Sequence, residues 1–190
     1  EEGEAGGRDL LDEESDEEGG GHARQLSVRS GVMDEKCAAL QALGLYAAHC
    51  CGPDASGQAG GGFEPHLLRA MELAVSCLDA FHEDLRHQAC EALGRLVAAT
   101  HRAFPPPPGS PPGTVSPQTQ AALAAACPGL SEALEDDDCG VVGACLGAWR
   151  ELLGGLGVAP LAQWATKVSE GVAAVLGGQA ACCEVYADEE

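Results

Sequence analysis

The chain has 190 residues, with 30 acidic against 10 basic side chains and a formal net charge of -20. This excess of acid excludes binding of nucleic acid through a basic surface. Hydrophobic residues make up 45% of the chain but aromatic ones only 4%, so we expect a core of Ala, Leu, Val and Cys. No apolar run approaches the roughly 20 residues that span a bilayer, so we expect no membrane insertion.

The first eighteen residues carry many acids and one cation, Arg8. Such a segment cannot bury enough apolar surface to offset its ordering entropy, so we expect an acidic disordered tract over residues 1–30. Its acids could contact a basic partner or form a solvated tail, and Ser15 fits an acid-directed kinase site. The candidate contacts are Asp12, Glu13, Glu14, Asp16, Glu17 and Glu18. The sequence starts at Glu1 rather than Met, so we expect a segment of a longer protein.

After residue 30, apolar residues recur at steps of three and four, the spacing of one face of a helix. Leu40, Leu43, Ala47 and Cys50 form the first such stripe. The pattern predicts helices over 34–50, 65–79, 83–104, 118–135, 139–153 and 160–176. We expect an all-α protein.

Prolines and glycines divide these stretches. The proline-rich segment 105–117 excludes helix and is interpreted as a linker. It also completes an Arg-x-x-Pro-x-x-Pro pattern from Arg102, the form of an SH3 ligand. Pro128 is expected to kink the fourth helix or to split it into 118–127 and 130–135. Gly154 and Gly155 are expected to end the fifth helix.

The ten cysteines contain no Cys-x-x-Cys pair, and most lie within apolar helical stripes. We interpret them as small buried hydrophobes, which favours a reducing cytosolic or nuclear compartment. The closest approach to a ligand cluster is His49, Cys50 and Cys51, whose side chains point in different directions on a helix. The chain carries none of the common catalytic or phosphate-binding motifs, so we expect no enzyme, metal or cofactor.

The first, third and fifth predicted helices start at Asp34, Glu83 and Cys139, a period of about 50 residues, which is typical of helical repeats with long loops. We therefore expect a solenoid over 31–181, with helix pairs at 34–79, 83–135 and 139–176. Residues 182–190 would begin a second acidic segment. An irregular bundle of six helices is the alternative.

One stretch of the sequence indicates a particular type of helical repeat. His82-Glu83-Asp84-Leu85-Arg86 is followed by Ala89 and by Glu91-Ala92-Leu93-Gly94, and it looks like the start of the first helix of a HEAT repeat. Asp84 would cap exposed amides, and Arg86 would reach a neighbouring repeat's turn, while Ala89 and Ala92 permit close packing. Asp138-Cys139-Gly140 lacks the corresponding arginine, so the same contact is not predicted there.

Together with Ser27-Val28, Met33-Asp34-Glu35-Lys36 and Ala42-Leu43-Gly44, this stretch resembles nuclear import receptors of the importin-beta superfamily. The resemblance implies a carrier that shuttles between cytoplasm and nucleus, binds basic cargo such as histones or ribosomal proteins, contacts Phe-Gly nucleoporins and releases cargo to Ran-GTP. Further candidate cargo contacts are Glu72, Asp79, Glu132 and Glu135.

Two other interpretations use the same acidic surface: a HEAT-repeat scaffold of another class, and a histone-binding module without transport. The tryptophans Trp149 and Trp164 lie on apolar stripes, where we expect them to pack between repeats. An exposed tryptophan would instead offer a pocket for a Phe of the nucleoporin repeats.

Overall fold

A computed structural model describes residues 20–52 and 62–184, and every regular element in these ranges is a helix. The predicted all-α class is therefore confirmed. Short 3-10 helices are η1 (Glu64–His66), η2 (Ala133–Glu135) and η3 (Ala159–Trp164). The α-helices are α1 (Gly20–Cys50), α2 (Leu67–Ser76), α3 (Glu83–Ala103), α4 (Pro117–Glu132), α5 (Cys139–Leu156), α6 (Ala165–Leu176) and α7 (Ala181–Glu184).

The chain divides into two compact units, Glu1–Asp34 and Glu35–Glu190, and α1 crosses the boundary. The predicted start of the first helix at Asp34 is wrong, because α1 begins at Gly20, inside the tract predicted to be disordered. The acids that suggested disorder end at Glu18, and the next stretch has no proline and contains good helix formers. Residues 1–19 and 185–190, with the predicted acidic contacts 12–18, lie outside the described ranges.

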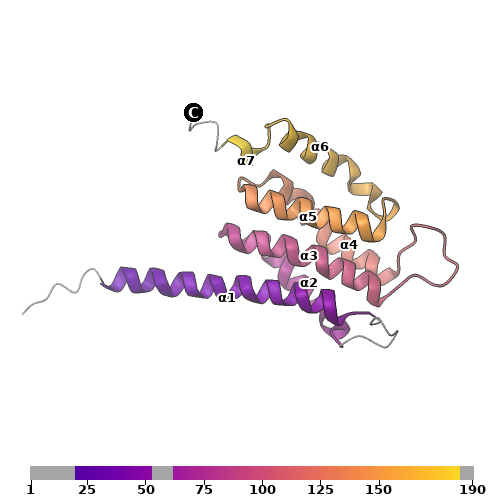
Figure 1. Ribbon diagram of the computed structural model, residues 1–190, viewed down its shortest axis with the longest axis horizontal. Helices are drawn as coiled ribbons and strands as arrows, with labels where there is room; N and C mark the ends of the chain where they lie inside the picture. Colours follow the sequence, from indigo (N-terminus) through magenta and orange to yellow (C-terminus); the bar gives the residue numbers. More distant parts are fainter. Residues whose placement is uncertain (1–19, 53–61, 185–190) are drawn as a thin grey trace, which may run out of the picture. The chain divides into compact units, whose positions relative to one another are not determined.

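Within the unit Glu35–Glu190, the helices α1, α3 and α5 lie side by side (Figure 1). Small residues lie where α1 packs against α3 and where α3 packs against α5. A Cβ built on Gly44 of α1 would lie 3.3 Å from the Ala92 Cα of α3, and one built on Gly94 of α3 would lie 3.0 Å from the Ala148 Cα of α5. The absence of larger side chains lets these backbones approach closely.

These neighbours run parallel, because like ends meet. At the C-terminal ends of α1 and α3, Arg102 Nη2 donates to the carbonyl oxygens of Ala47 at 3.3 Å and Ala48 at 2.9 Å. At the N-terminal ends of α3 and α5, His87 Nδ1 lies 3.0 Å from the Gly140 carbonyl oxygen. The helices α1, α3 and α5 thus form a first row in which all three have the same orientation.

A second row consists of α2 and α4. Leu67 at the start of α2 and Gln118 at the start of α4 line the same groove, and Leu78 after the end of α2 fills the space beside Gly129 near the end of α4. These helices also run parallel. Beyond them, η2 contacts α6 through Leu134, which packs against Gly171.

The core lies between the rows and is built from small and medium side chains, as the composition predicted. Most of α3 is buried, including Leu93 and Leu96, which have no exposed surface. Leu123 of α4 and Leu152 of α5 complete this layer. Burial of such leucines stabilises the fold by about 25 cal/mol per Å² of apolar area.

Pro128 does not split α4, so that part of the prediction is wrong: the helix is continuous from Pro117 to Glu132. Pro128 cannot donate to the carbonyl of Ala124, but both residues lie on the exposed face, where water can reach that carbonyl. The buried Leu123 and Leu130 on either side hold the two halves in one helix.

Gly154 and Gly155 do not end the fifth helix either. The helix α5 continues to Leu156, which is buried together with Leu152 one turn earlier, and this burial favours the additional turn. The helix ends at Gly157, whose φ of 78° is a conformation that favours glycine.

The remaining boundaries are close to those predicted. The first helix ends at Cys50 as expected, and the third runs from Glu83 to Ala103. The second begins with η1 around Pro65 and ends at Ser76 rather than near Asp79. The sixth begins as η3 around Pro160 and becomes α-helical at Ala165.

Candidate functional site: an acidic hollow around Arg86

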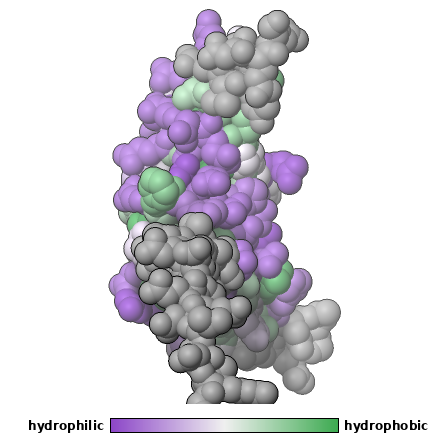
Figure 2. All heavy atoms as spheres, turned by 90° about the vertical axis from the view of Figure 1, so that its left-hand side faces the viewer, coloured by the Kyte–Doolittle hydropathy of each residue, from purple (hydrophilic) through white to green (hydrophobic). Residues whose placement is uncertain are grey.

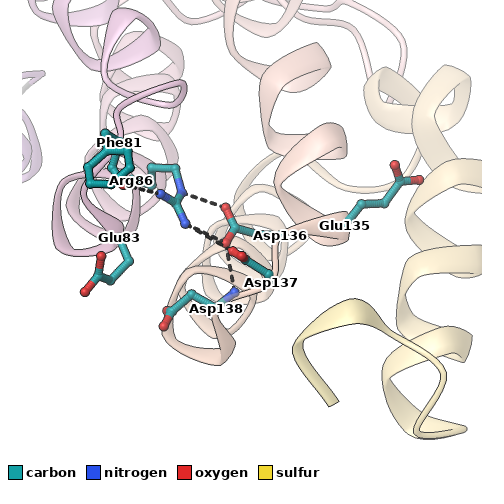
Figure 3. Close-up of a pocket in the computed structure, with 7 residues that line it drawn as sticks. All are labelled: Phe81, Glu83, Arg86, Glu135, Asp136, Asp137 and Asp138. Atoms are coloured by element: carbon teal, nitrogen blue, oxygen red, sulfur yellow. Dashed lines mark hydrogen bonds and ion pairs between the residues drawn. The ribbon is translucent and has the colours of Figure 1, made fainter. Parts of the chain in front are cut away.

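The loops that enter α3 and α5 lie next to each other and enclose an open hollow of about 740 Å³. Five carboxylates and one guanidinium line it, and Figure 3 shows Asp136 and Asp137 against Arg86 while Glu135 points away from it. We call this site the Arg86 hollow. Its lining residues are Phe81, Glu83, Arg86, Glu135, Asp136, Asp137 and Asp138. In Figure 2, which faces the left-hand side of Figure 1, hydrophilic residues dominate the surface.

Arg86 lies at the centre of the hydrogen-bond network. Its Nε donates to Asp136 Oδ2 at 2.7 Å and its Nη2 to Asp136 Oδ1 at 2.9 Å, which is a bidentate pair. Nη2 also lies 3.4 Å from Asp137 Oδ1. Nη1 donates to the carbonyl oxygens of Ala80 and Phe81, each at 3.1 Å. One side chain thus joins the loop before α3 to the loop before α5.

Arg86 thus reaches the loop between η2 and α5. The pair is mostly buried, with 16% of the Arg86 side chain and 12% of the Asp136 side chain exposed. Burial alone would raise the pKa of Asp136, but the hydrogen bonds from Arg86 and from the Asp138 N–H hold this pKa below its ordinary value. The hydrogen bond to Asp136 in turn raises the pKa of Arg86.

The predicted cap of α3 is wrong. The cap is His82, whose Nδ1 accepts from the Asp84 N–H at 3.3 Å, and Asp84 lies in the first turn. There its carboxylate still complements the positive end of the helix dipole. Asp138 caps α5, because its Oδ1 accepts from the Val141 N–H at 2.9 Å.

The other residues of the repeat-like stretch pack as predicted. Ala89, Ala92 and Leu93 are completely buried in α3, and Ala92 faces Gly44 of α1. Near the start of α5, where the sequence has no corresponding arginine, the described residues form no arginine bridge to the next element of the row. There Cys139 Sγ donates to the Cys182 carbonyl oxygen of α7 at 3.0 Å. Separately, Lys167 of α6 forms an ion pair with Glu135 of η2.

The structure brings only some of the candidate cargo contacts together. Glu135 lines the Arg86 hollow, and Glu132 precedes it by one helical turn, exposed at the end of α4. Asp79 is exposed in the loop before α3. Glu72 lies elsewhere and pairs with Arg69 of its own helix at 3.2 Å. Sequence reasoning missed Phe81, which is 98% exposed at the rim of the hollow, and its isolation from any apolar stripe was the available signal.

An apolar groove of about 360 Å³ lies between α5 and α6. Trp149 lines it but is only 3% exposed, and its Nε1 donates to the Leu130 carbonyl oxygen at 3.3 Å. Trp164 packs against Trp149 with ring centroids 6.5 Å apart. The predicted packing role of these tryptophans is confirmed. Leu153 and Val158 provide the exposed apolar surface of the groove.

The prediction that cysteines in helical stripes are buried holds only in part, because Cys37, Cys50 and Cys77 are only partly buried. Cys90, Cys127 and Cys145 are completely buried. Burial raises the pKa of Cys127 to about 12, so this thiol stays protonated at neutral pH. No disulfide and no cluster of three potential metal ligands occurs among the described residues. Within the same ranges, no helix has both the length and the apolar character needed to span a bilayer.

The SH3-ligand interpretation of the proline-rich segment is not favoured by the structure. Arg102 lies in the last turn of α3 and binds the carbonyl oxygens at the end of α1, as described above. An SH3 ligand would need this arginine in an extended segment with its guanidinium available.

Comparison of the chain with known protein families, with curated proteins and with solved structures gave no match.

Proposed function

We propose that this chain is part of a HEAT-repeat carrier of the importin-beta superfamily, which binds basic proteins such as histones or ribosomal proteins and releases them to Ran-GTP. The fold supports a solenoid, because two rows of parallel helices repeat one packing arrangement along the chain. Arg86 bridges successive helix pairs in the manner that the resemblance implies.

The observation that carries the proposal is the charge of the Arg86 hollow. Arg86 compensates Asp136, and Lys167 compensates Glu135. The carboxylates of the hollow outnumber these two cations, because Asp137 shares the same Arg86, whose Nη2 lies 3.4 Å from its Oδ1. Glu83 and Asp137 expose 53% and 83% of their side chains. The net charge of -20 adds a long-range attraction for cations.

The surface next to these carboxylates suits lysine and arginine side chains. Phe81 presents an almost fully exposed ring beside Arg86 and Glu83 (Figure 3). An aromatic face attracts cations and also packs against the aliphatic part of a long basic side chain. Each exposed ion pair contributes only about 0 to 1 kcal/mol, so affinity would depend on several contacts and fall with salt.

The groove between α5 and α6 offers a second surface for a carrier. It is almost entirely apolar and is lined by Trp149, Leu153 and Val158 among others. Its size, about 360 Å³, suits one aromatic side chain of a Phe-Gly nucleoporin. The proposed localisation, shuttling between cytoplasm and nucleus, follows from this function.

The test is binding of a core histone to the protein in the presence of Ran-GTP or Ran-GDP. A carrier binds the histone without Ran and loses it to Ran-GTP but not to Ran-GDP. A HEAT scaffold or a histone-binding module without transport would hold the histone equally in both conditions, and this result would refute the transport proposal. Loss of histone binding at physiological salt without Ran would refute the acidic-surface proposal.

A further inference from the structure

The loop between α3 and α4 contains two consecutive tight turns of nearly identical sequence, Pro107-Pro108-Gly109-Ser110 and Pro111-Pro112-Gly113-Thr114. In the first turn the Ser110 N–H donates to the Pro107 carbonyl oxygen at 3.1 Å, and in the second the Thr114 N–H donates to the Pro111 carbonyl oxygen at the same distance. The glycines have φ of 85° and 81°. Proline followed by glycine in this conformation defines a type II turn.

The two turns place Ser110 at their junction. Ser110 is partly exposed, and Pro108, Gly109 and Pro111 around it are exposed. Because a residue before proline is restricted to extended conformations, the Ser110-Pro111 step is extended in the folded protein. A kinase active site binds its substrate segment in an extended form, and a proline after the serine is accepted only by proline-directed kinases.

A second Ser-Pro step in the same loop differs in one decisive respect. Ser116 precedes Pro117, but its side chain caps α4: its Oγ accepts from the Thr119 N–H at 3.2 Å and lies 2.9 Å from Thr119 Oγ1. Only 4% of Ser116 is exposed. A kinase could reach this hydroxyl only after the start of α4 had unfolded.

From this contrast we infer that Ser110 is a phosphorylation site for a proline-directed serine/threonine kinase, and that Ser116 is not. The proline two residues before Ser110, Pro108, matches the preference of the mitogen-activated class, whereas Thr114 stands at that position before Ser116. The inference does not depend on the proposed transport function.

The reaction uses ATP as its phosphoryl donor. Ser110 Oγ attacks the γ-phosphorus, the bond from this phosphorus to the β–γ bridging oxygen breaks, ADP leaves, and the hydroxyl proton passes to the catalytic aspartate of the kinase. Ser110 Oγ now donates to the Pro107 carbonyl oxygen at 2.7 Å, and the ester oxygen can no longer do so. The product adds about -1.5 to -2 charges and loosens the first turn.

The experiment is phosphorylation of the folded protein by a mitogen-activated protein kinase with ATP, with sites and rates determined by mass spectrometry. A synthetic peptide of residues 104–121 serves as the unfolded reference, because it presents both Ser-Pro steps without the α4 helix. We expect the kinase to modify Ser110 in both substrates. The rate at Ser116, relative to Ser110, should be at least about tenfold lower in the folded protein than in the peptide, because the capped hydroxyl is buried.

Two variants make the result specific. Ser110→Ala should abolish phosphorylation of the folded protein, and Pro111→Ala, which keeps the hydroxyl, should lower its rate at Ser110 at least tenfold. The matched Pro112→Ala variant keeps the Ser-Pro step and should be phosphorylated at the wild-type rate. An unmodified Ser110 in the folded protein, equal modification of Ser116 in protein and peptide, or a Pro111→Ala rate equal to wild type would each overturn the inference.

Discussion

Substitution of Arg86 by Ala tests the bridge between successive helix pairs. The change removes the bidentate pair with Asp136 and the two hydrogen bonds to the carbonyls of Ala80 and Phe81. It also leaves Asp136 as a carboxylate with 12% of its side chain exposed and no cation. Removing one partner of a buried ion pair costs about 3 to 5 kcal/mol, and because this pair lies beside an open hollow we expect about 3 kcal/mol.

At roughly 2 to 4 °C per kcal/mol for a chain of this size, Tm should fall by about 6 to 12 °C. Urea unfolding followed by far-UV circular dichroism measures the free energy of unfolding directly. The matched control is Arg69→Ala, which breaks an exposed pair with side chains 73% and 54% exposed. That change should cost no more than about 0.5 kcal/mol.

The same pair predicts a pH dependence. The folded-state pKa of Asp136 is lowered, so its stabilising contribution is complete above the ordinary Asp pKa of about 3.9 and is lost as pH falls through the lower folded-state value. The difference between wild type and Arg86→Ala should therefore shrink in strong acid. If the two arginine variants were equally stable at neutral pH, or if their difference did not change in acid, the proposed role of the pair would be wrong.

Three further predictions concern single residues. Asp138→Ala should destabilise the protein by about 1 kcal/mol through loss of the α5 cap. Asp84→Ala should change the free energy of unfolding by less than about 0.5 kcal/mol, because Asp84 is not the cap of α3. Equal losses in urea unfolding would contradict the assignment of the caps. Gly94→Ala places a Cβ 3.0 Å from the Ala148 Cα of α5 and should lower the free energy of unfolding by about 1 to 3 kcal/mol. In the matched Gly143→Ala variant the new Cβ meets nothing within 4 Å, so the change should stabilise α5 by up to about 1 kcal/mol. A stabilising effect of Gly94→Ala would exclude the close packing of α3 against α5. Burial raises the pKa of the Cys127 thiol from its ordinary value of 9.0 to about 12, so Tm should fall as pH rises above about 9. Cys127→Ala should weaken this alkaline loss, and an unchanged alkaline profile would contradict the burial of the thiol.

The sequence predicted the helices well where apolar stripes determine burial. The predicted helix 139–153 carries apolar residues at steps of three and four, namely Val142, Cys145, Trp149 and Leu152, and all four side chains are buried in α5. These stripes suffice because burial of one helical face is decided by residues within the same helix.

Local signals failed where a distant contact decides the outcome. Pro128 was expected to kink or to split α4, and the split does not occur because the core on both sides keeps the helix continuous. Arg86 reaches the loop between η2 and α5, whereas its partner Asp136 could not be chosen from sequence, since three consecutive aspartates had the same local character. Phe81 belongs to no periodic pattern, which was a sign of its exposure, but its place beside Arg86 is evident only once the helices are packed.

The most direct test of the account is the affinity for a basic histone-tail peptide, measured by fluorescence anisotropy at several salt concentrations. The variant neutralises two exposed acids of the Arg86 hollow, Glu83→Gln and Asp137→Asn, together with Asp84→Asn in the first turn of α3. A control with the same charge change elsewhere carries Glu72→Gln, Glu151→Gln and Glu170→Gln.

At about 0.5 kcal/mol for each exposed pair, the first variant should lose roughly tenfold in affinity and become less sensitive to salt. The control variant should lose less than about threefold, because only the general charge of the chain has changed. Equal losses in both variants, or no loss in the first, would contradict binding of basic proteins at the Arg86 hollow.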